Sequence, residues 1–447
     1  MQKTINIGRA CAALSFLMLS TVVPYACAEP EAESEGAPWD IKFQATTVQQ
    51  RKPSFPAAYS GPNSLSTDRE QSWSTTATVF AGARTWSGGE IYFNPEMAMG
   101  RPFSNLTGLG GFTNGELAKT SSANPTFYRA RLFLRQTWNI GPASEAVEAD
   151  QNQLAGHVSA ERWVLTAGNF SAADVFDDNS YSHESRRQFL NWSIMTHGAW
   201  DYPADSRGYT VGAALEYYRP DWALRIGRFM QPKQSNGLAL NPRIFDSYGD
   251  VAEVEYGYAL RNQPGKVRLL AFRNVARMAS YQAANDAAAA GTGKPDIDTV
   301  REKRSKTGYG INLEQALGKN VGLFLRASRA DGKTETYAFA EIDRSVSGGM
   351  DIKGGAWSRP NDNAGFAMVR NELSAGHRDY LRAGGLGFFL GDGRLDYGPE
   401  QIAEVYYSAA LTANFWLSLN GQRIRNPGYN LARGPVSFYG LRMHIEF

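Results

Sequence analysis

Residues 436–447 read VSFYGLRMHIEF, and the alternation in this stretch decides the fold. Every second residue is apolar or aromatic, the file being Tyr439, Leu441, Met443, Ile445 and Phe447. The residues between them are Gly440, Arg442, His444 and Glu446. Successive side chains of a β-strand point to opposite faces, so one face is apolar and the other is polar or charged. This division is typical of a strand with lipid on one side and water on the other.

Three other segments, 128–135, 209–217 and 403–411, alternate in the same way. In the second of them the apolar file begins at Tyr209 and ends at Tyr217, as aromatic belts at two membrane interfaces require. We therefore predict an all-β transmembrane antiparallel barrel.

The lengths of the links between such segments decide the number of strands. Seventeen segments alternate, but an odd number is unusual in a bacterial single-chain barrel. Short links such as 85–88 alternate with long ones such as 99–127. This rhythm fails only if 384–390 is a strand. Treating 372–400 as one long loop restores it. The result is a barrel of 16 strands with a water-filled lumen. The predicted strands are 41–48, 74–84, 89–98, 128–139, 160–170, 208–218, 222–230, 250–259, 265–275, 307–316, 320–329, 343–353, 363–371, 401–412, 415–424 and 436–447. We interpret the alanine-rich run 283–290 as a loop with no more than one helical turn.

The first residues indicate export. Lys3 and Arg9 precede an apolar run over 11–23, and Ala26-Cys27-Ala28 forms a cleavage site. The run is too short to span a membrane as a helix. We predict a signal peptide over 1–28 and one barrel domain over 29–447.

Cleavage removes both cysteines of the chain, Cys11 and Cys27, and with them any disulfide or thiol site. It also lowers the 46 basic residues to 44, which equals the 44 acidic ones and argues against nucleic-acid binding. No two of the five histidines have metal-ligand spacing, and no nucleophile elbow or phosphate-binding loop occurs. We expect no enzyme activity, metal or cofactor.

Charged residues are predicted on the lumen side of the wall. Arg129, Arg131 and Arg135 share one face of a strand by parity, and Glu404 faces inward on another. Opposed charges in a narrow pore could filter solutes or only brace the wall, and both readings stay open.

The third long loop, 171–207, is unusually aromatic and includes Trp192, Trp200 and Tyr202. Full exposure of such a loop would be costly. We predict that it folds into the lumen, where its rings could pack on sugars. Packing against neighbouring loops is the alternative.

Several motifs resemble carbohydrate-selective porins of the OprB family. They include 55–65 (FPAAYSGPNSL), Gly89-Glu90-x-Tyr92-x-Asn94-Pro95-Glu96, 168–171 (GNFS), 397–400 (YGPE) and 426–430 (NPGYN). The resemblance covers nearly all of the mature chain. Many members of the family have lysine where this chain has Asn169, so the charge near the constriction is expected to differ from theirs.

This resemblance implies a sixteen-stranded channel in the outer membrane of a Gram-negative bacterium, constricted by its third loop. It implies passive diffusion of glucose and related small carbohydrates, with Glu96 among the candidate constriction residues. Outer-membrane lipid and, during biogenesis, the barrel assembly machinery are the expected partners, and porins in general suggest a homotrimer. A general or anion-preferring porin, or a barrel that anchors an enzyme or adhesin, are the competing functions.

Overall fold

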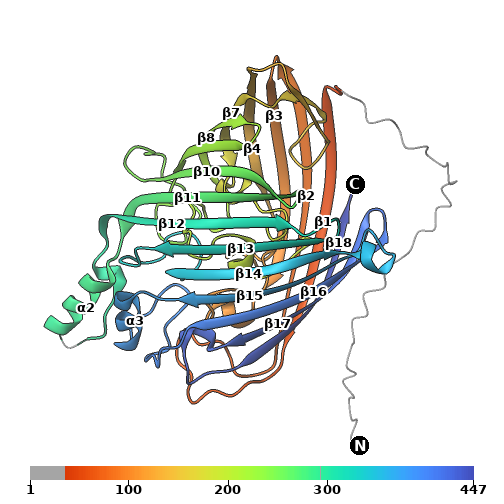
Figure 1. Cartoon of the computed structure of the whole chain (residues 1–447). Helices are drawn as coiled ribbons and strands as arrows, with labels where there is room; N and C mark the ends of the chain where they lie inside the picture. Colours follow the sequence, from red (N-terminus) through yellow and green to blue (C-terminus); the bar gives the residue numbers. More distant parts are fainter. Residues whose placement is uncertain (1–35, 292) are drawn as a thin grey trace, which may run out of the picture. The chain divides into compact units, whose positions relative to one another are not determined.

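Sixteen antiparallel strands close into a barrel in the computed structural model, which describes residues 36–291 and 293–447 (Figure 1). The strands are β1 (Trp39–Lys52), β2 (Glu70–Trp86), β3 (Gly89–Arg101), β4 (Thr126–Asn139), β7 (Arg162–Phe170), β8 (Thr210–Arg219), β9 (Trp222–Met230), β10 (Tyr248–Leu260), β11 (Gln263–Met278), β12 (Glu302–Ala316), β13 (Val321–Ala330), β14 (Arg344–Lys353), β15 (Asn363–Glu372), β16 (Glu400–Thr412), β17 (Phe415–Arg425) and β18 (Val436–Glu446). β1 pairs with β18 and so closes the ring. The predicted signal peptide, 1–28, lies outside the described residues.

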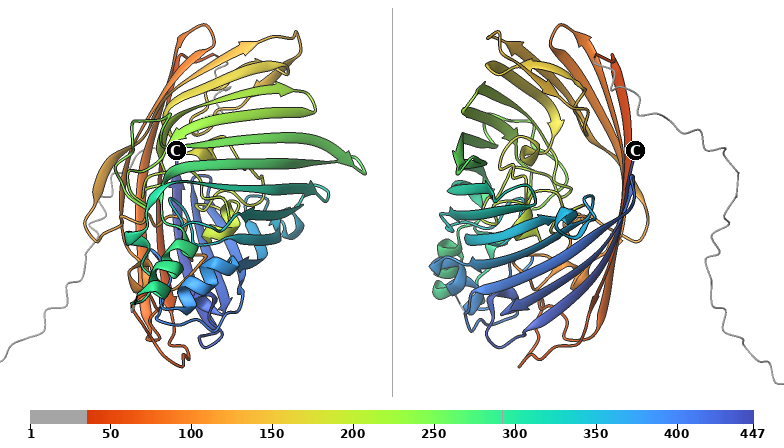
Figure 2. Two further views of the ribbon diagram at one scale, coloured as in Figure 1. Left: turned by 90° about the vertical axis from the view of Figure 1, so that its left-hand side faces the viewer. Right: turned by 45° about the vertical axis from the view of Figure 1, so that its right-hand side comes forward.

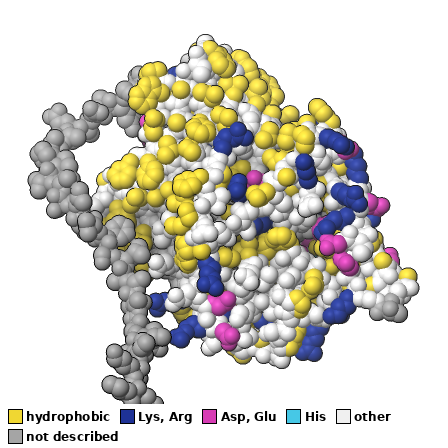
Figure 3. Space-filling view, turned by 180° about the vertical axis from the view of Figure 1, so that it is seen from behind, with side chains coloured by type: hydrophobic (Ala, Val, Ile, Leu, Met, Phe, Trp, Pro, Cys, Tyr) yellow, Lys and Arg dark blue, Asp and Glu magenta, His cyan; other side chains and the backbone are white. Residues whose placement is uncertain are grey.

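Alternation along the strands separates the two faces of the wall. In β18, Arg442 faces inward and is 1% exposed, whereas Tyr439, three residues earlier, faces outward and is 60% exposed. Large apolar side chains are exposed all round the outer surface, Leu419 and Met368 among them. Figure 3 shows one face of the molecule, on which apolar side chains gather over a broad area. The predicted fold and the predicted facing of the last strand are confirmed.

The links follow the predicted rhythm with one exception. Residues 384–390 form no strand, as predicted. The link between β4 and β7, which the rhythm predicts to be a short turn, is instead a long excursion that carries the small hairpin of β5 (Ser144–Val147) and β6 (Gly156–Ser159).

The long loops contain short helices. In the described part of the chain the α-helices are α1 (Trp192–Met195), α2 (Tyr281–Ala290) and α3 (Ala375–Arg382). The 3-10 turns are η1 (Phe103–Leu106), η2 (Ala172–Asp174), η3 (Ile297–Thr299), η4 (Gly354–Trp357) and η5 (Pro427–Tyr429). Among the described residues, no helix is both long and apolar enough to cross a bilayer.

The prediction of at most one helical turn over 283–290 is wrong. α2 has ten residues, because the side chain of Ser280 caps its first turn and alanine is the best helix former. The helix is held in place by α3, where the ring of His377 stacks on Tyr281 with centroids 4.1 Å apart.

A β-bulge corrects the predicted facing of Arg129. The register between β3 and β4 shifts at Asn94/Pro95, and an extra residue in β4 reverses the parity there. Arg129 Nε donates to Asn169 Oδ1, and Asn169 lies opposite the outward-facing Leu132. Arg129 therefore lies on the outer surface.

Tyr209 also departs from the predicted outward file. It precedes β8, which begins at Thr210, and its hydroxyl donates to Glu96 on the inner wall. The apolar outward file of β8 therefore starts at Val211.

The outward facing of Met443 gives a testable expectation for assembly. A charge on the lipid face costs about 2–4 kcal/mol near the middle of the membrane. We expect Met443→Arg to reduce the heat-modifiable, folded band on electrophoresis strongly, while Met443→Leu leaves it unchanged. Equal folding of both variants would show that this face does not meet lipid.

Candidate functional site

The segment 171–207 is held against the inner wall by a buried arginine of β13. Arg326 Nε donates to Asp177 Oδ1 at 2.9 Å, and its Nη1 donates to the carbonyl oxygens of Ser182 at 2.7 Å and Ile194 at 2.9 Å. Burial opposes the ionisation of Asp177, but Arg326, His197 and Thr196 outweigh it and hold the pKa of this carboxyl well below its usual range.

Other wall residues hold the same segment at different points around the ring. Glu404 of β16 accepts hydrogen bonds from the backbone N–H groups of Leu190 at 2.6 Å and Asn191 at 3.0 Å. Arg442 of β18 donates to the carbonyl oxygen of Ser185 at 2.6 Å. The segment therefore lies inside the ring of strands, where Figure 2 shows it in yellow-green.

A cavity of about 240 Å³ lies where the segment leaves the wall of β2, β3 and β4 uncovered. A second long loop, 102–125, completes its lining. The polar and aromatic residues that line it include Glu96, Glu116, Lys119, Tyr128, Arg131, Asp174, Arg186, Trp192, Tyr202, Asp205, Arg207, Tyr209 and Phe339. The cavity is just below the roughly 300–1,000 Å³ range of typical small-molecule sites.

Each of two arginines in the cavity wall faces a carboxylate. Arg131 donates twice to Asp174, over 2.7 and 2.6 Å. Arg186 Nε lies 3.0 Å from Glu116 Oε2. Burial disfavours the charged form of both acids, but the arginines and further hydrogen bonds outweigh it, and the pKa values of Asp174 and Glu116 fall below their usual range. Both pairs stay ionised at neutral pH, and within each pair the charge of the arginine offsets that of the carboxylate.

The carboxylate of Glu96 on β3 accepts hydrogen bonds from hydroxyl groups of three different parts of the chain. Thr78 Oγ1 donates to its carboxylate at 2.6 Å and Tyr209 at 3.2 Å, and Tyr128 also donates to it. Arg186 Nη2 approaches to 3.4 Å. The resulting surface offers both hydrogen-bond donors and acceptors to a solute.

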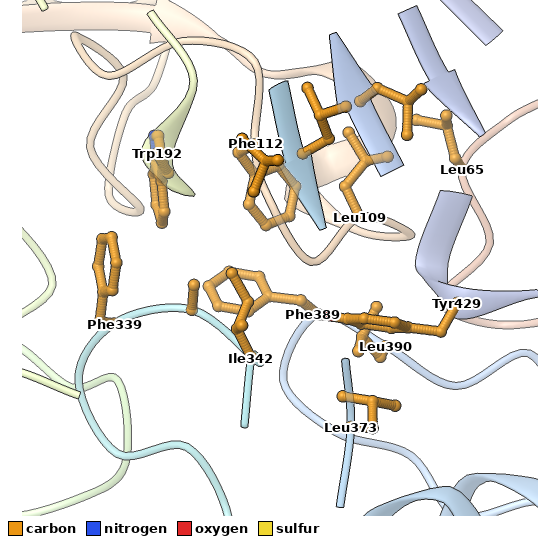
Figure 4. Packing of buried hydrophobic residues seen from close by; sticks show 14 of the residues in the cluster. Leu65, Leu109, Phe112, Trp192, Phe339, Ile342, Leu373, Phe389, Leu390 and Tyr429 are labelled. Carbon is orange, nitrogen blue, oxygen red and sulfur yellow. The ribbon is translucent and has the colours of Figure 1, made fainter. Parts of the chain in front are cut away.

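Aromatic rings form the other side of the cavity. Trp192 stacks on Phe339, with centroids 5.7 Å apart and planes 12° from parallel, and Tyr202 lies 4.8 Å from Phe339. Trp192 Nε1 donates to the carbonyl oxygen of Asn114 at 2.8 Å, which fixes the indole. Figure 4 shows Trp192, Phe339, Phe112 and Phe389 turned toward one another.

Lys119 lies between this cavity and a larger one of about 690 Å³ among the long loops. Its Nζ is 5.1 Å from the ring centre of Phe389 and 5.9 Å from that of Phe388, which lines the larger cavity. It donates to the carbonyl oxygen of Phe339 at 2.9 Å. Burial lowers the pKa of Lys119 to about 7, although Asp201, Glu341 and Asp205 oppose the shift.

This pKa predicts a pH-dependent ion preference. Lys119 is mostly charged below pH 7 and mostly neutral above it, so raising the pH from 6 to 8 removes positive charge from the pathway. We expect the reversal potential in a salt gradient to move away from anion preference over this interval. Lys119→Met should remove the step, and an unchanged step in that variant would exclude this lysine as its source.

The structure brings four of the predicted site residues together and leaves four apart. Glu96, Arg131, Trp192 and Tyr202 line the smaller cavity. The four that do not line it are Arg129, Arg135, Trp200 and Glu404.

The structure explains why Arg135, Trp200 and Glu404 do not line the cavity. Arg135 lies near the short-turn end, where it donates to the carbonyl oxygen of Asn152 at 2.8 Å. Trp200 is 0% exposed, because it packs with Phe176 in a hydrophobic cluster. The carboxylate of Glu404 accepts hydrogen bonds from two backbone N–H groups of the segment 171–207 and does not reach the cavity.

Most of the cavity residues lie outside the predicted set, among them Glu116, Lys119, Arg186 and Tyr209. Two of them, Glu116 and Lys119, belong to the loop 102–125, whose inward course has no signal in alternation. Arg186 lies in the aromatic loop that is predicted to enter the lumen.

Taken together, the closed sixteen-stranded ring and the polar, aromatic cavity inside it define a porin, a channel of the Gram-negative outer membrane. The family model for "Carbohydrate-selective porin, OprB family" matches residues 71–447, and the chain belongs to this family. Family and fold point to a channel rather than to an enzyme.

Solved structures of outer-membrane channels are similar in fold. The structure of Pseudomonas putida OprB at high pH has a TM-score of 0.68 at 16% sequence identity, covering 92% of this chain and 94% of that one. The outer membrane channel DcaP of Acinetobacter baumannii has a TM-score of 0.50 at 10% identity, covering 92% and 99%. No curated protein sequence matches the chain.

Proposed function

We propose that this porin conducts neutral monosaccharides such as glucose by passive diffusion, and that the cavity between 171–207 and the wall of β2–β4 is its constriction. The half-buried Tyr202 and the stacked pair of Trp192 and Phe339, which are 6% and 3% exposed, form the apolar side of the cavity against which the C–H face of a sugar would pack. On the opposite wall, the N–H groups of Arg131 that Asp174 does not engage and the hydroxyl oxygens of Tyr128 and Tyr209, which Glu96 orients, are the partners for its hydroxyl groups.

The observation that carries this proposal is the compensation of charge at the cavity. Arg131 faces Asp174, and Arg186 faces Glu116 and Glu96, so the strongest fixed charges occur in opposed pairs. Such a wall gives many hydrogen-bonding groups but little net field. A polyhydroxylated solute without charge suits it better than an ion does. Contacts that are individually weak also let the solute leave again, which conduction requires.

An anion-preferring porin is the second candidate, and Arg207 and Lys119 favour it. Neither forms an ion pair with a carboxylate in the described part of the chain, and both line the cavity. Their charges would attract anions if the acidic residues nearby did not offset them.

Liposome swelling separates the two candidates. Vesicles containing the porin should swell in isosmotic glucose faster than in a disaccharide, because a larger solute passes the constriction more slowly. Vesicles in sodium gluconate, which matches glucose in size but carries a negative charge, should swell more slowly than those in glucose. Faster swelling in gluconate would favour the anion porin, and no swelling above protein-free vesicles would contradict both.

A further inference from the structure

Arginines end the outward-facing files of many strands on the side of the long loops. In β13 the file runs Leu323, Leu325, Ala327 and then Arg329. The same change from apolar side chains to arginine occurs elsewhere around the ring, at Arg101, Arg228, Arg273, Arg344, Arg370 and Arg423. The long-loop end of such a barrel faces the cell exterior. These side chains therefore lie at the level of the outer leaflet's headgroups.

The short-turn end of the barrel is different. Tryptophans prevail on its outer surface, with exposed fractions of 62% for Trp39, 56% for Trp86 and 47% for Trp138. Aromatic side chains of this kind form the usual interfacial belt. The long-loop end also exposes aromatic side chains, such as Tyr309 at 62% and Tyr439 at 60%, so its distinguishing feature is the row of arginines that adjoins them.

Arg329 and Arg344 form the sharpest feature of this arginine-rich rim. They lie directly opposite each other on β13 and β14, and both are exposed on the outer surface. Among the described residues no ion pair joins either of them to a carboxylate, although Glu372 of β15 lies directly opposite Arg344. Like charges directly opposite in a sheet destabilise it. An anion bound between the two guanidinium groups would remove that repulsion.

A third arginine and an apolar surface adjoin this pair. Arg370 lies diagonally across from Arg344 on β15, where it pairs with Glu372 at 2.7 Å. Below the arginines, toward the membrane interior, Val346 and Met368 expose 51% and 60% of their surface. A ligand that fits this site has an anionic head and hydrocarbon tails.

We propose that Arg329 and Arg344, flanked by Arg370, bind a phosphate group of an outer-leaflet lipid, whose acyl chains pack along β13–β15. Guanidinium groups bind phosphate oxygens bidentately, and two of them can share one phosphate. Their stems remain in contact with the apolar surface while their charges reach the headgroup level. The site is separate from the conducting cavity, since its side chains point away from the lumen.

Native mass spectrometry of the full porin in detergent, titrated with lipid A that carries two phosphates, tests this site. We expect the double variant Arg329→Gln/Arg344→Gln to bind lipid A roughly 30-fold more weakly, since each basic side chain contributes about 1 kcal/mol near an anionic lipid surface. Arg219→Gln is the matched control, because Arg219 is 47% exposed at the short-turn end. It should bind lipid A as the unaltered protein does. Arg329→Lys/Arg344→Lys should fall between, since it keeps the charge but loses the bidentate geometry.

Two further arms identify the ligand. Dephosphorylated lipid A should bind the unaltered porin as weakly as the double variant binds the phosphorylated form. Inorganic phosphate at the same concentration should not displace lipid A. Equal binding of lipid A by the double variant and the unaltered protein would overturn the proposal, as would equal binding of the dephosphorylated lipid. Displacement by inorganic phosphate would assign the site to free phosphate instead. Unchanged heat-modifiable mobility of the variants verifies that they are folded.

Discussion

Replacement of Arg326 by alanine should raise the single-channel conductance several-fold and make the open current noisy. Arg326 holds the inner segment 171–207 through Asp177 and through the carbonyl oxygens of Ser182 and Ile194. Removing one partner of a buried ion pair costs about 3–5 kcal/mol, because the other charge is left without compensation. The buried carboxylate of Asp177 would then favour movement of its segment toward water, which widens the pore.

The control for this experiment lies on the same strand. Arg329 is three residues further along β13 but points outward, so Arg329→Ala should leave the conductance unchanged in a bilayer of synthetic lipids. Single-channel recording at one salt concentration provides both values. Equal conductance for Arg326→Ala and the unaltered porin would mean that the inner segment is held without this arginine.

Replacement of Trp192 by alanine should weaken the block of ion current by glucose roughly threefold to tenfold, while the current without sugar changes little. The indole forms one wall of the cavity and is held flat against Phe339. A threefold to tenfold change corresponds to about 0.7–1.4 kcal/mol of lost contact between the indole and the sugar. The measurement is the glucose concentration that halves the current.

Trp163 provides the control for the loss of a tryptophan. It lies on β7 with 39% of its surface exposed on the outside of the barrel. Trp163→Ala should leave the half-blocking concentration unchanged. If Trp192→Ala and the unaltered porin have the same half-blocking glucose concentration, the ring of Trp192 does not contact the sugar.

The fold was largely predictable because a membrane barrel repeats one simple constraint along its whole length. Each strand must present apolar side chains to lipid at every second position, so the alternation at 436–447 and 403–411 identifies strands and their faces together. The failures occur where local geometry breaks the period. Parity predicts Arg129 in the lumen, but a bulge that the sequence does not mark reverses the parity at this residue. α2 formed where a serine cap and a run of alanines were interpreted as loop.

The site was less predictable, because it is made by loops whose course depends on tertiary contacts. The aromatic content of 171–207 indicates an inward course, but not which rings end in the cavity and which in the core. Trp192 and Trp200 are eight residues apart in the same loop, and only the first lines the cavity. Lys119 is part of a loop whose inward position follows from packing against Phe389 and Trp192, and composition alone does not reveal that packing.

Titration of the single-channel current with glucose shows whether neutral sugars pass through the cavity beside Glu96, Arg131 and Trp192. We expect the current to fall saturably as glucose is added from the side of the long loops, and polyethylene glycol too large to enter to have no such effect. We also expect Trp192→Ala to shift the half-blocking concentration upward. A current that changes with glucose only as the solution conductivity does would contradict the proposed function.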